Sequence, residues 1–308
     1  MAVRENECSE LKPEGNPWRI YFCKLTACIA DSNLLIASAA LLSLYQTYLL
    51  LAIPLRPEPL GFFIFPSVFM LYHFHRLIAI PATDERQWSA SQRWFMQNSF
   101  TAILMLMIAF FSALTCFILL PVKTKLALLP LAGLALAYSV PLLFLKHKRL
   151  RLRDFGIIKP FVIGGVWAGA TVILPVIHFG VGLTVRDGGM LFLERFFFIS
   201  ALCVPFDIKD IAVDVTRIHK PTIAARWGVK TARQAGLLLL VCFFAITAGE
   251  WALRLPWMSG SVFAAYLLSF LITAVVLARV HESRNEHYYT VCIDGTIIIQ
   301  ALLILLMK

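Results

Sequence analysis

The chain has 308 residues, of which 59% are hydrophobic and only 15% charged, and its mean hydropathy is +0.77. Soluble domains carry nearer a quarter of charged residues, so this composition predicts a polytopic membrane protein and excludes an ordinary soluble one. The net charge of +10 is attributed to membrane orientation and anionic lipids, not to nucleic acid. The seven scattered cysteines imply neither a disulfide framework nor a zinc site.

Nine apolar stretches are long enough to cross a bilayer, which takes about 20 residues. In chain order they are Leu25–Ile53, Phe62–Ile80, Phe95–Leu120, Leu126–Leu145, Phe155–Gly180, Met190–Phe206, Ala235–Leu253, Val262–Val280 and Val291–Met307. The sixth is short for a span. We expect an all-α membrane bundle of about nine transmembrane helices, forming one integral-membrane domain over residues 1–308 with an N-terminal tail at 1–24.

The Lys and Arg residues predict the orientation of this bundle. Most of the 28 fall in the N-terminal tail and in the loops that would lie on the same side of the membrane as the tail. The segments assigned to the opposite side carry fewer, and Arg186, Arg195 and Arg254 are among these. Positive loops face the cytoplasm, so the N-terminus is expected to be cytoplasmic.

Polar side chains inside the spans are candidate functional groups, because they are costly in a membrane. They are Asp31, Asn33, His73, His75, Arg76, Lys159 and Asp294. Each has an alternative role as an interhelical hydrogen bond or a charge at a headgroup. His73 and His75 point about 160° apart on a helix and cannot chelate one ion together. Gly164, Gly165 and Gly169 are expected to let helices approach closely.

Three aspartates follow the sixth span with helical spacing. Asp207, Asp210 and Asp214 share one narrow helix face, where like charges repel unless a cation lies between them. Mg²⁺ prefers carboxylate oxygens at a site that leaves room for water and substrate phosphates. The alternative is a solvated helix end with interleaved charges.

Two segments resemble motifs of the UbiA superfamily of intramembrane prenyltransferases. The first is Asp207, Asp210, Asp214, a basic loop and then Thr222-Ile223-Ala224-Ala225-Arg226-Trp227-Gly228, similar to the family's second aspartate-rich motif. The second is Tyr138-Ser139-Val140-Pro141 followed by Lys146, Arg149 and Lys159. The resemblance covers essentially the whole chain.

The family's first aspartate-rich motif has no equivalent here. In place of N-x-x-x-D-x-x-x-D this chain has His73, Leu77 and Pro81, with Asp84 and Glu85 further along. One hypothesis is that Arg76 contacts phosphate directly and replaces one metal ion.

The resemblance implies transfer of a prenyl chain from a polyprenyl diphosphate to a lipophilic or aromatic acceptor, with Mg²⁺ as cofactor. Asp207, Asp210 and Asp214 would hold the metal and be catalytic. The implied substrate-binding residues are Asn33, His73, Arg76, Tyr138, Lys146, Arg149 and Lys159. Two alternatives remain open, a relative that binds an isoprenoid or a partner without catalysis, and a polytopic transporter.

Overall fold

The computed structural model describes residues 29, 31–79, 88–141, 143–145, 148–211 and 221–308, and these are predominantly helical. The helices are α2 (Leu34–Leu50), α3 (Pro59–Ala79), α4 (Ala90–Gln97), α5 (Ser99–Leu119), α6 (Val122–Ser139), α7 (Lys159–Ala168), α8 (Leu174–Phe179), α9 (Val185–Lys209), α11 (Ile223–Ala252), α12 (Gly260–Ala278) and α13 (Asp294–Met307). Shorter elements are the hairpin β1 (Leu143–Leu145) and β2 (Lys148–Leu150), the 3₁₀ turn η3 (Leu152–Asp154) and the π-helical segments η4 (Gly169–Ile173) and η5 (Tyr288–Ile293).

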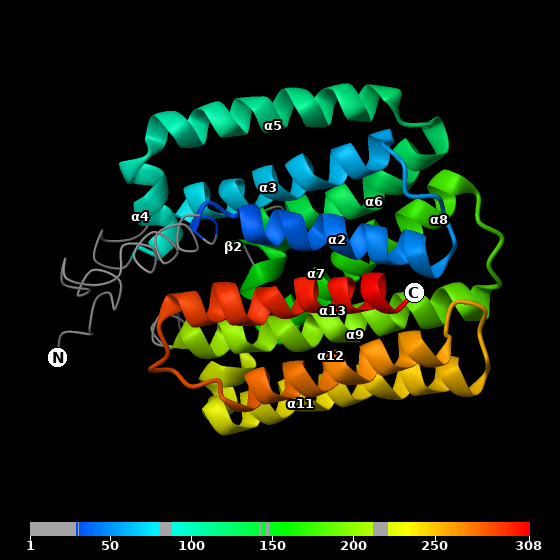
Figure 1. Cartoon of the computed structure of the whole chain (residues 1–308). Coiled ribbons are helices and arrows are strands. Elements are labelled where there is room, and N and C mark those ends of the chain that lie inside the picture. Colours follow the sequence, from blue (N-terminus) through cyan, green and yellow to red (C-terminus); the bar gives the residue numbers. More distant parts are fainter. Residues whose placement is uncertain (1–28, 30, 80–87, 142, 146–147, 212–220) are drawn as a thin grey trace, which may run out of the picture.

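The long helices lie side by side and alternate in direction (Figure 1). Helix α9 packs against α7 and α11, while α2 packs against α3 and α13. The described loop residues after α3, α6, α9 and α12 lie at one end of the bundle, at the left in Figure 1. These are the loops in which the sequence concentrates its positive charge.

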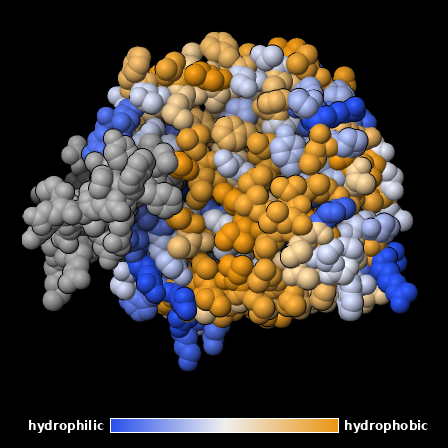
Figure 2. Space-filling view, in the orientation of Figure 1, coloured by the Kyte–Doolittle hydropathy of each residue, from blue (hydrophilic) through white to orange (hydrophobic). Residues whose placement is uncertain are grey.

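The described helices have the composition of membrane spans. Seven helical segments are long and apolar enough to cross a membrane, and α2 is a shorter apolar helix. Figure 2 shows a broad hydrophobic band between ends that carry the hydrophilic side chains. Helices α5 and α6 expose large apolar side chains, such as Phe100, Ile108, Phe111, Leu126 and Leu129. The predicted all-α integral-membrane bundle is confirmed.

The sixth span differs from its prediction. Helix α9 has 25 residues and begins at Val185, so it extends beyond Met190–Phe206 at both ends. Arg195, which the predicted topology counts with the outer segments, is fully buried inside α9. Its Nη1 donates to the backbone oxygen of Ser43 over 3.0 Å, and the neighbouring Glu194 accepts from the Tyr266 hydroxyl over 2.9 Å. Polar partners on other helices explain how α9 carries these charges without ending.

The fourth span also ends early. Helix α6 stops at Ser139, and the last residues of the predicted span Leu126–Leu145 form strand β1 instead. The reason is Pro141, which disfavours helical backbone at Val140 before it. The β1–β2 hairpin is the one addition to the expected all-α architecture among the described residues.

Gly164 brings α7 and α9 into close contact. A Cβ at this position would lie 2.8 Å from the backbone oxygen of Phe196 and would overlap the Ser200 hydroxyl. Gly169 is similarly close to Leu131, whereas a Cβ on Gly165 would meet nothing within 4 Å. The prediction of close approach is therefore confirmed for Gly164 and Gly169 and wrong for Gly165.

The segment opening α11 behaves as its sequence indicates. The Thr222 hydroxyl accepts from the Ala225 amide over 3.2 Å and caps the helix. Gly228 has φ of 84°, a left-handed conformation that side chains other than glycine rarely adopt, and it kinks α11. Thr222 itself reaches the cavity described next.

Candidate active site

A cavity of about 390 Å³ opens at the end of the bundle where the positively charged loops gather. Its walls come from α2, α3, α4, α6, η3, α7, α9 and the η5–α13 segment. The polar lining residues are Tyr72, His75, Ser89, Gln92, Tyr138, Arg153, Asp154, Lys159, Lys209, Asp210, Thr222, Glu286, Thr290 and Asp294. The apolar ones are Ile36, Ile163, Trp167, Ile199, Leu202, Cys203, Phe206 and Ile297. One cavity thus combines a charged end with an apolar interior.

The tightest charged contact of the site joins Lys159 to Asp207. Lys159 is the first residue of α7, and Asp207 lies in the last turn of α9 and is fully buried. The Lys159 ammonium donates to Asp207 Oδ1 over 2.7 Å. The close α7–α9 contact at Gly164 brings these two helices together. Because a buried carboxylate is costly without a partner, this pair fixes Lys159 at the cavity wall.

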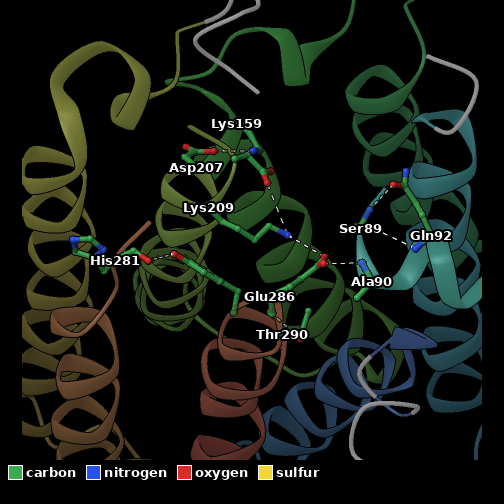
Figure 3. A network of polar contacts seen from close by, with 11 residues as sticks. Ser89, Ala90, Gln92, Lys159, Asp207, Lys209, His281, Glu286 and Thr290 are labelled. Atoms are coloured by element: carbon green, nitrogen blue, oxygen red, sulfur yellow. Dashed lines mark hydrogen bonds and ion pairs between the residues drawn. The ribbon is translucent and has the colours of Figure 1, made fainter. Parts of the chain in front are cut away.

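A second lysine is held more loosely (Figure 3). The Lys209 ammonium lies 3.4 Å from Glu286 Oε1 and 3.9 Å from Asp210 Oδ1. The Asp210 side chain is 46% exposed, whereas Asp207 one turn earlier is buried. The two aspartates therefore occupy different environments, although their spacing places them on adjacent turns.

Arg153 adds a third cation to the cavity wall. It lies in η3, beside Asp154, which forms an ion pair with Arg151 at 3.3 Å. Arg153 makes no hydrogen bond or ion pair with the part of the chain that the structure describes. Lys159, Lys209 and Arg153 border the same space as four carboxylates, Asp154, Asp210, Glu286 and Asp294. The charged end therefore offers an anionic group three cations to contact, beside carboxylates of the opposite charge.

An apolar crevice of about 110 Å³ adjoins the cavity between α3, α6 and α7. The two share Tyr72, His75, Tyr138, Ile163 and Trp167 as lining residues. The His75 and Tyr138 rings lie 5.4 Å apart. An elongated apolar ligand could therefore extend from the cavity towards the lipid-facing side of the bundle.

The predicted site residues divide into three groups. Asp210, Tyr138 and Lys159 line the cavity, and Asp207 contacts Lys159. Asn33 and His73 lie side by side instead, with Asn33 Nδ2 3.3 Å from His73 Nδ1, and neither lines the cavity. The backbones of Arg76 and Arg149 lie in α3 and β2, while Lys146 and Asp214 lie outside the described residues.

His73 and His75 face different neighbours, as their spacing predicted. His73 contacts Asn33, the residue before α2, and His75 lines the cavity. Among the residues that the structure describes, no three His, Cys, Asp or Glu side chains gather as a metal site. Mg²⁺ commonly takes one or two protein carboxylates and fills its remaining positions with water and phosphate oxygens. The half-exposed carboxylate of Asp210 fits that limited requirement.

Several cavity residues were not identified as site residues from the sequence. Glu286, Thr290 and Asp294 recur every four residues, which places them on one helix face at the cavity. That periodicity is visible in the sequence, which predicted a candidate functional group at Asp294 but not at Glu286 or Thr290. Lys209 and Arg153 carried no local signal beyond their positive charge.

Two solved structures share the architecture of this chain, while no protein-family model and no curated protein matches it. One is the apo structure of a UbiA homolog from Aeropyrum pernix K1, with 16% identity and a TM-score of 0.59. The other comes from work on digeranylgeranylglyceryl phosphate synthase in membranes, with 12% identity and a TM-score of 0.56. Each alignment covers 92% of this chain and 98% of the other. The chain therefore has a UbiA-like fold.

Proposed function

We propose that this protein is an intramembrane prenyltransferase that moves a prenyl chain from a polyprenyl diphosphate to a lipophilic or aromatic acceptor. The observation that carries the proposal is the cavity, which joins three cationic side chains to an apolar interior within a UbiA-like membrane bundle. A prenyl diphosphate has the same division between a charged head and an apolar chain.

The cations Lys159, Lys209 and Arg153 would receive the diphosphate. Charge-assisted hydrogen bonds from ammonium and guanidinium groups to phosphate oxygens are strong and short. Asp207 holds Lys159 in place over 2.7 Å. Further contacts are proposed for Arg76 of α3, Arg149 of β2 and Lys146.

Mg²⁺ is the proposed cofactor, and Asp210 and Asp214 are its proposed protein ligands, together with phosphate oxygens. Asp207 remains a proposed ligand through the oxygen that does not accept from Lys159. When bound, the ion would neutralise part of the charge on the leaving diphosphate. Lys159, Lys209 and Arg153 would contact the same diphosphate group.

The reaction would break the bond between the first carbon of the prenyl chain and the diphosphate oxygen. The electron pair leaves on the diphosphate, where Lys159, Lys209 and Arg153 stabilise the added charge. The allylic cation left behind faces aromatic rings, for which Tyr72, Tyr138 and Trp167 are placed in the cavity wall. The acceptor nucleophile then bonds to that carbon and loses its proton.

Binding without catalysis is the second candidate function. Its support is the missing first motif, because α3 presents His73 and Leu77 where related sequences have an asparagine and an aspartate. In that case the cavity would hold an isoprenoid diphosphate and leave it intact.

Release of pyrophosphate separates the two candidates. The purified protein in lipid nanodiscs is incubated with Mg²⁺, geranyl, farnesyl or geranylgeranyl diphosphate, and a panel of lipophilic acceptors. We expect Mg²⁺-dependent pyrophosphate release with one acceptor class. Asp210→Asn should reduce the rate at least about a hundredfold, since it removes a carboxylate that acts on the leaving group. Binding of the diphosphate with no release under any condition would favour the second candidate.

A further inference from the structure

Glu286 connects three parts of the chain at the cavity mouth (Figure 3). It lies just before η5, and its side chain is 22% exposed. Its Oε2 accepts from the backbone amide of Ala90 over 2.7 Å, across 196 residues of sequence. Its Oε1 accepts from the Lys209 ammonium over 3.4 Å, across 77 residues. One carboxylate therefore contacts both the start of α4 and the end of α9.

The contact of Glu286 with Ala90 depends on the geometry of the first turn of α4. Ser89 and Gln92 form a reciprocal capping box, in which Ser89 Oγ accepts from the Gln92 amide over 3.2 Å and Gln92 Oε1 accepts from the Ser89 amide over 2.9 Å. Ala90, the first residue of α4, has an amide without an intrahelical partner. Glu286 satisfies this amide, and its negative charge is favourable at a helix N-terminus. Ser89 and Gln92 also line the cavity, so this contact fixes part of the cavity wall.

The contact with Lys209 differs from the other lysine contact of the site. Lys159 and Asp207 are 2.7 Å apart with a fully buried carboxylate, whereas Lys209 lies 3.4 Å from Glu286 and 3.9 Å from the half-exposed Asp210. A longer and more solvated contact is weaker. Lys159 is therefore the fixed cation, and Lys209 is the one that an incoming anion can draw away from its carboxylate.

We infer that Glu286 is a positioning residue for the proposed transferase site. It holds the Lys209 ammonium at the cavity wall, ready for a diphosphate, and fastens the start of α4 beside it. Without the charge of Glu286, Lys209 would keep its contact with Asp210 at 3.9 Å and its place over the Phe206 ring at 5.9 Å, and its ammonium would be held less firmly. The inference rests on the proposed function for its effect on substrate, but the structural coupling of Glu286 to α4 stands apart from it.

Two variants separate the two contacts of Glu286. Glu286→Gln keeps an oxygen that can accept from the Ala90 amide and removes the charge that holds Lys209. Glu286→Ala removes both contacts. Glu282→Gln is the matched control, because Glu282 is an exposed acid in the same loop and does not line the cavity.

Hydrogen exchange by mass spectrometry on the full chain in nanodiscs tests the contact with α4. We expect Glu286→Ala to accelerate amide exchange at the start of α4 about tenfold, since the Ala90 amide loses its acceptor. Exchange in Glu286→Gln and Glu282→Gln should match the unmodified protein. Unchanged exchange in Glu286→Ala would overturn the role of Glu286 at α4, whether or not the protein has transferase activity.

Steady-state kinetics with the active prenyl diphosphate test the contact with Lys209. Glu286→Gln should raise KM for the diphosphate about fivefold with kcat within about twofold, the pattern of weakened substrate binding. Glu282→Gln should leave both constants unchanged. An unaltered KM in Glu286→Gln would overturn the role of Glu286 towards Lys209. If the unmodified protein shows no turnover, the proposed function fails, and affinity for farnesyl diphosphate replaces KM in the same comparison.

Discussion

At the scale of single residues, the site depends on how each charge is balanced. Asp207 is buried and paired with Lys159, whereas Asp210 is half exposed and only loosely paired. The helical spacing of the aspartates predicted that they lie on one face. It could not predict this difference, because the partner Lys159 lies 48 residues away in sequence. The spacing of Glu286, Thr290 and Asp294 indicates a shared helix face, but the contacts of Glu286 with Ala90 and Lys209 are distant in sequence and could not be predicted from it.

Removing Lys159 should destabilise the protein through Asp207. Lys159→Met leaves a fully buried carboxylate without its cation, a change that costs about 3 kcal/mol in comparable buried pairs. The double variant Lys159→Met, Asp207→Asn removes both charges and should recover most of that loss. Thermal unfolding in nanodiscs measures both effects. Equal melting temperatures for Lys159→Met and the unmodified protein would show that the pair contributes nothing to stability.

At the scale of helices, the apolar pattern predicted the spans well and their ends less well. A proline and distant hydrogen-bond partners account for the errors in the predicted helix ends. Pro141 ends α6 early, and α9 continues through Glu194 and Arg195, each of which has one hydrogen bond to another helix, from the Tyr266 hydroxyl and to the Ser43 carbonyl. Ser43 and Tyr266 are both distant in sequence from α9, so hydropathy averaged over a sequence window cannot detect these partners.

The contact between α7 and α9 can be tested with a pair of adjacent glycines. Gly164→Val should destabilise the fold by about 2 kcal/mol, because its side chain would overlap the backbone oxygen of Phe196 and the Ser200 hydroxyl. The shift should also part Lys159 from Asp207 and reduce pyrophosphate release. Gly165→Val is the control, since nothing lies within 4 Å of that position.

Thermal unfolding and activity are measured on both glycine variants. The account predicts a clear loss for Gly164→Val and a small change for Gly165→Val. Similar losses in the two would mean that helix propensity at either glycine, and not the contact with α9, controls stability.

At the scale of the whole molecule, a UbiA-like bundle places its charged loops at one end, and the cavity opens there. The charge pattern predicted that these loops share a side of the membrane, and the alternating helices agree. Their assignment to the cytoplasmic side stays a prediction, as does the metal-binding role of Asp207, Asp210 and Asp214. The composition of the cavity could be read only from the folded chain, because its walls combine helical segments that are far apart in sequence.

The most direct test of the central claim is a cryo-electron microscopy structure with farnesyl thiodiphosphate and Mg²⁺. The slowly reacting analogue keeps both the diphosphate and the chain of a prenyl substrate. The account predicts diphosphate density in contact with Lys159, Lys209 and Arg153, with Mg²⁺ at Asp210. The farnesyl chain should run past Tyr138 and Trp167 towards the crevice between α3, α6 and α7. Density for the analogue outside this cavity, or an inverted ligand with its chain at the charged end, would contradict the account.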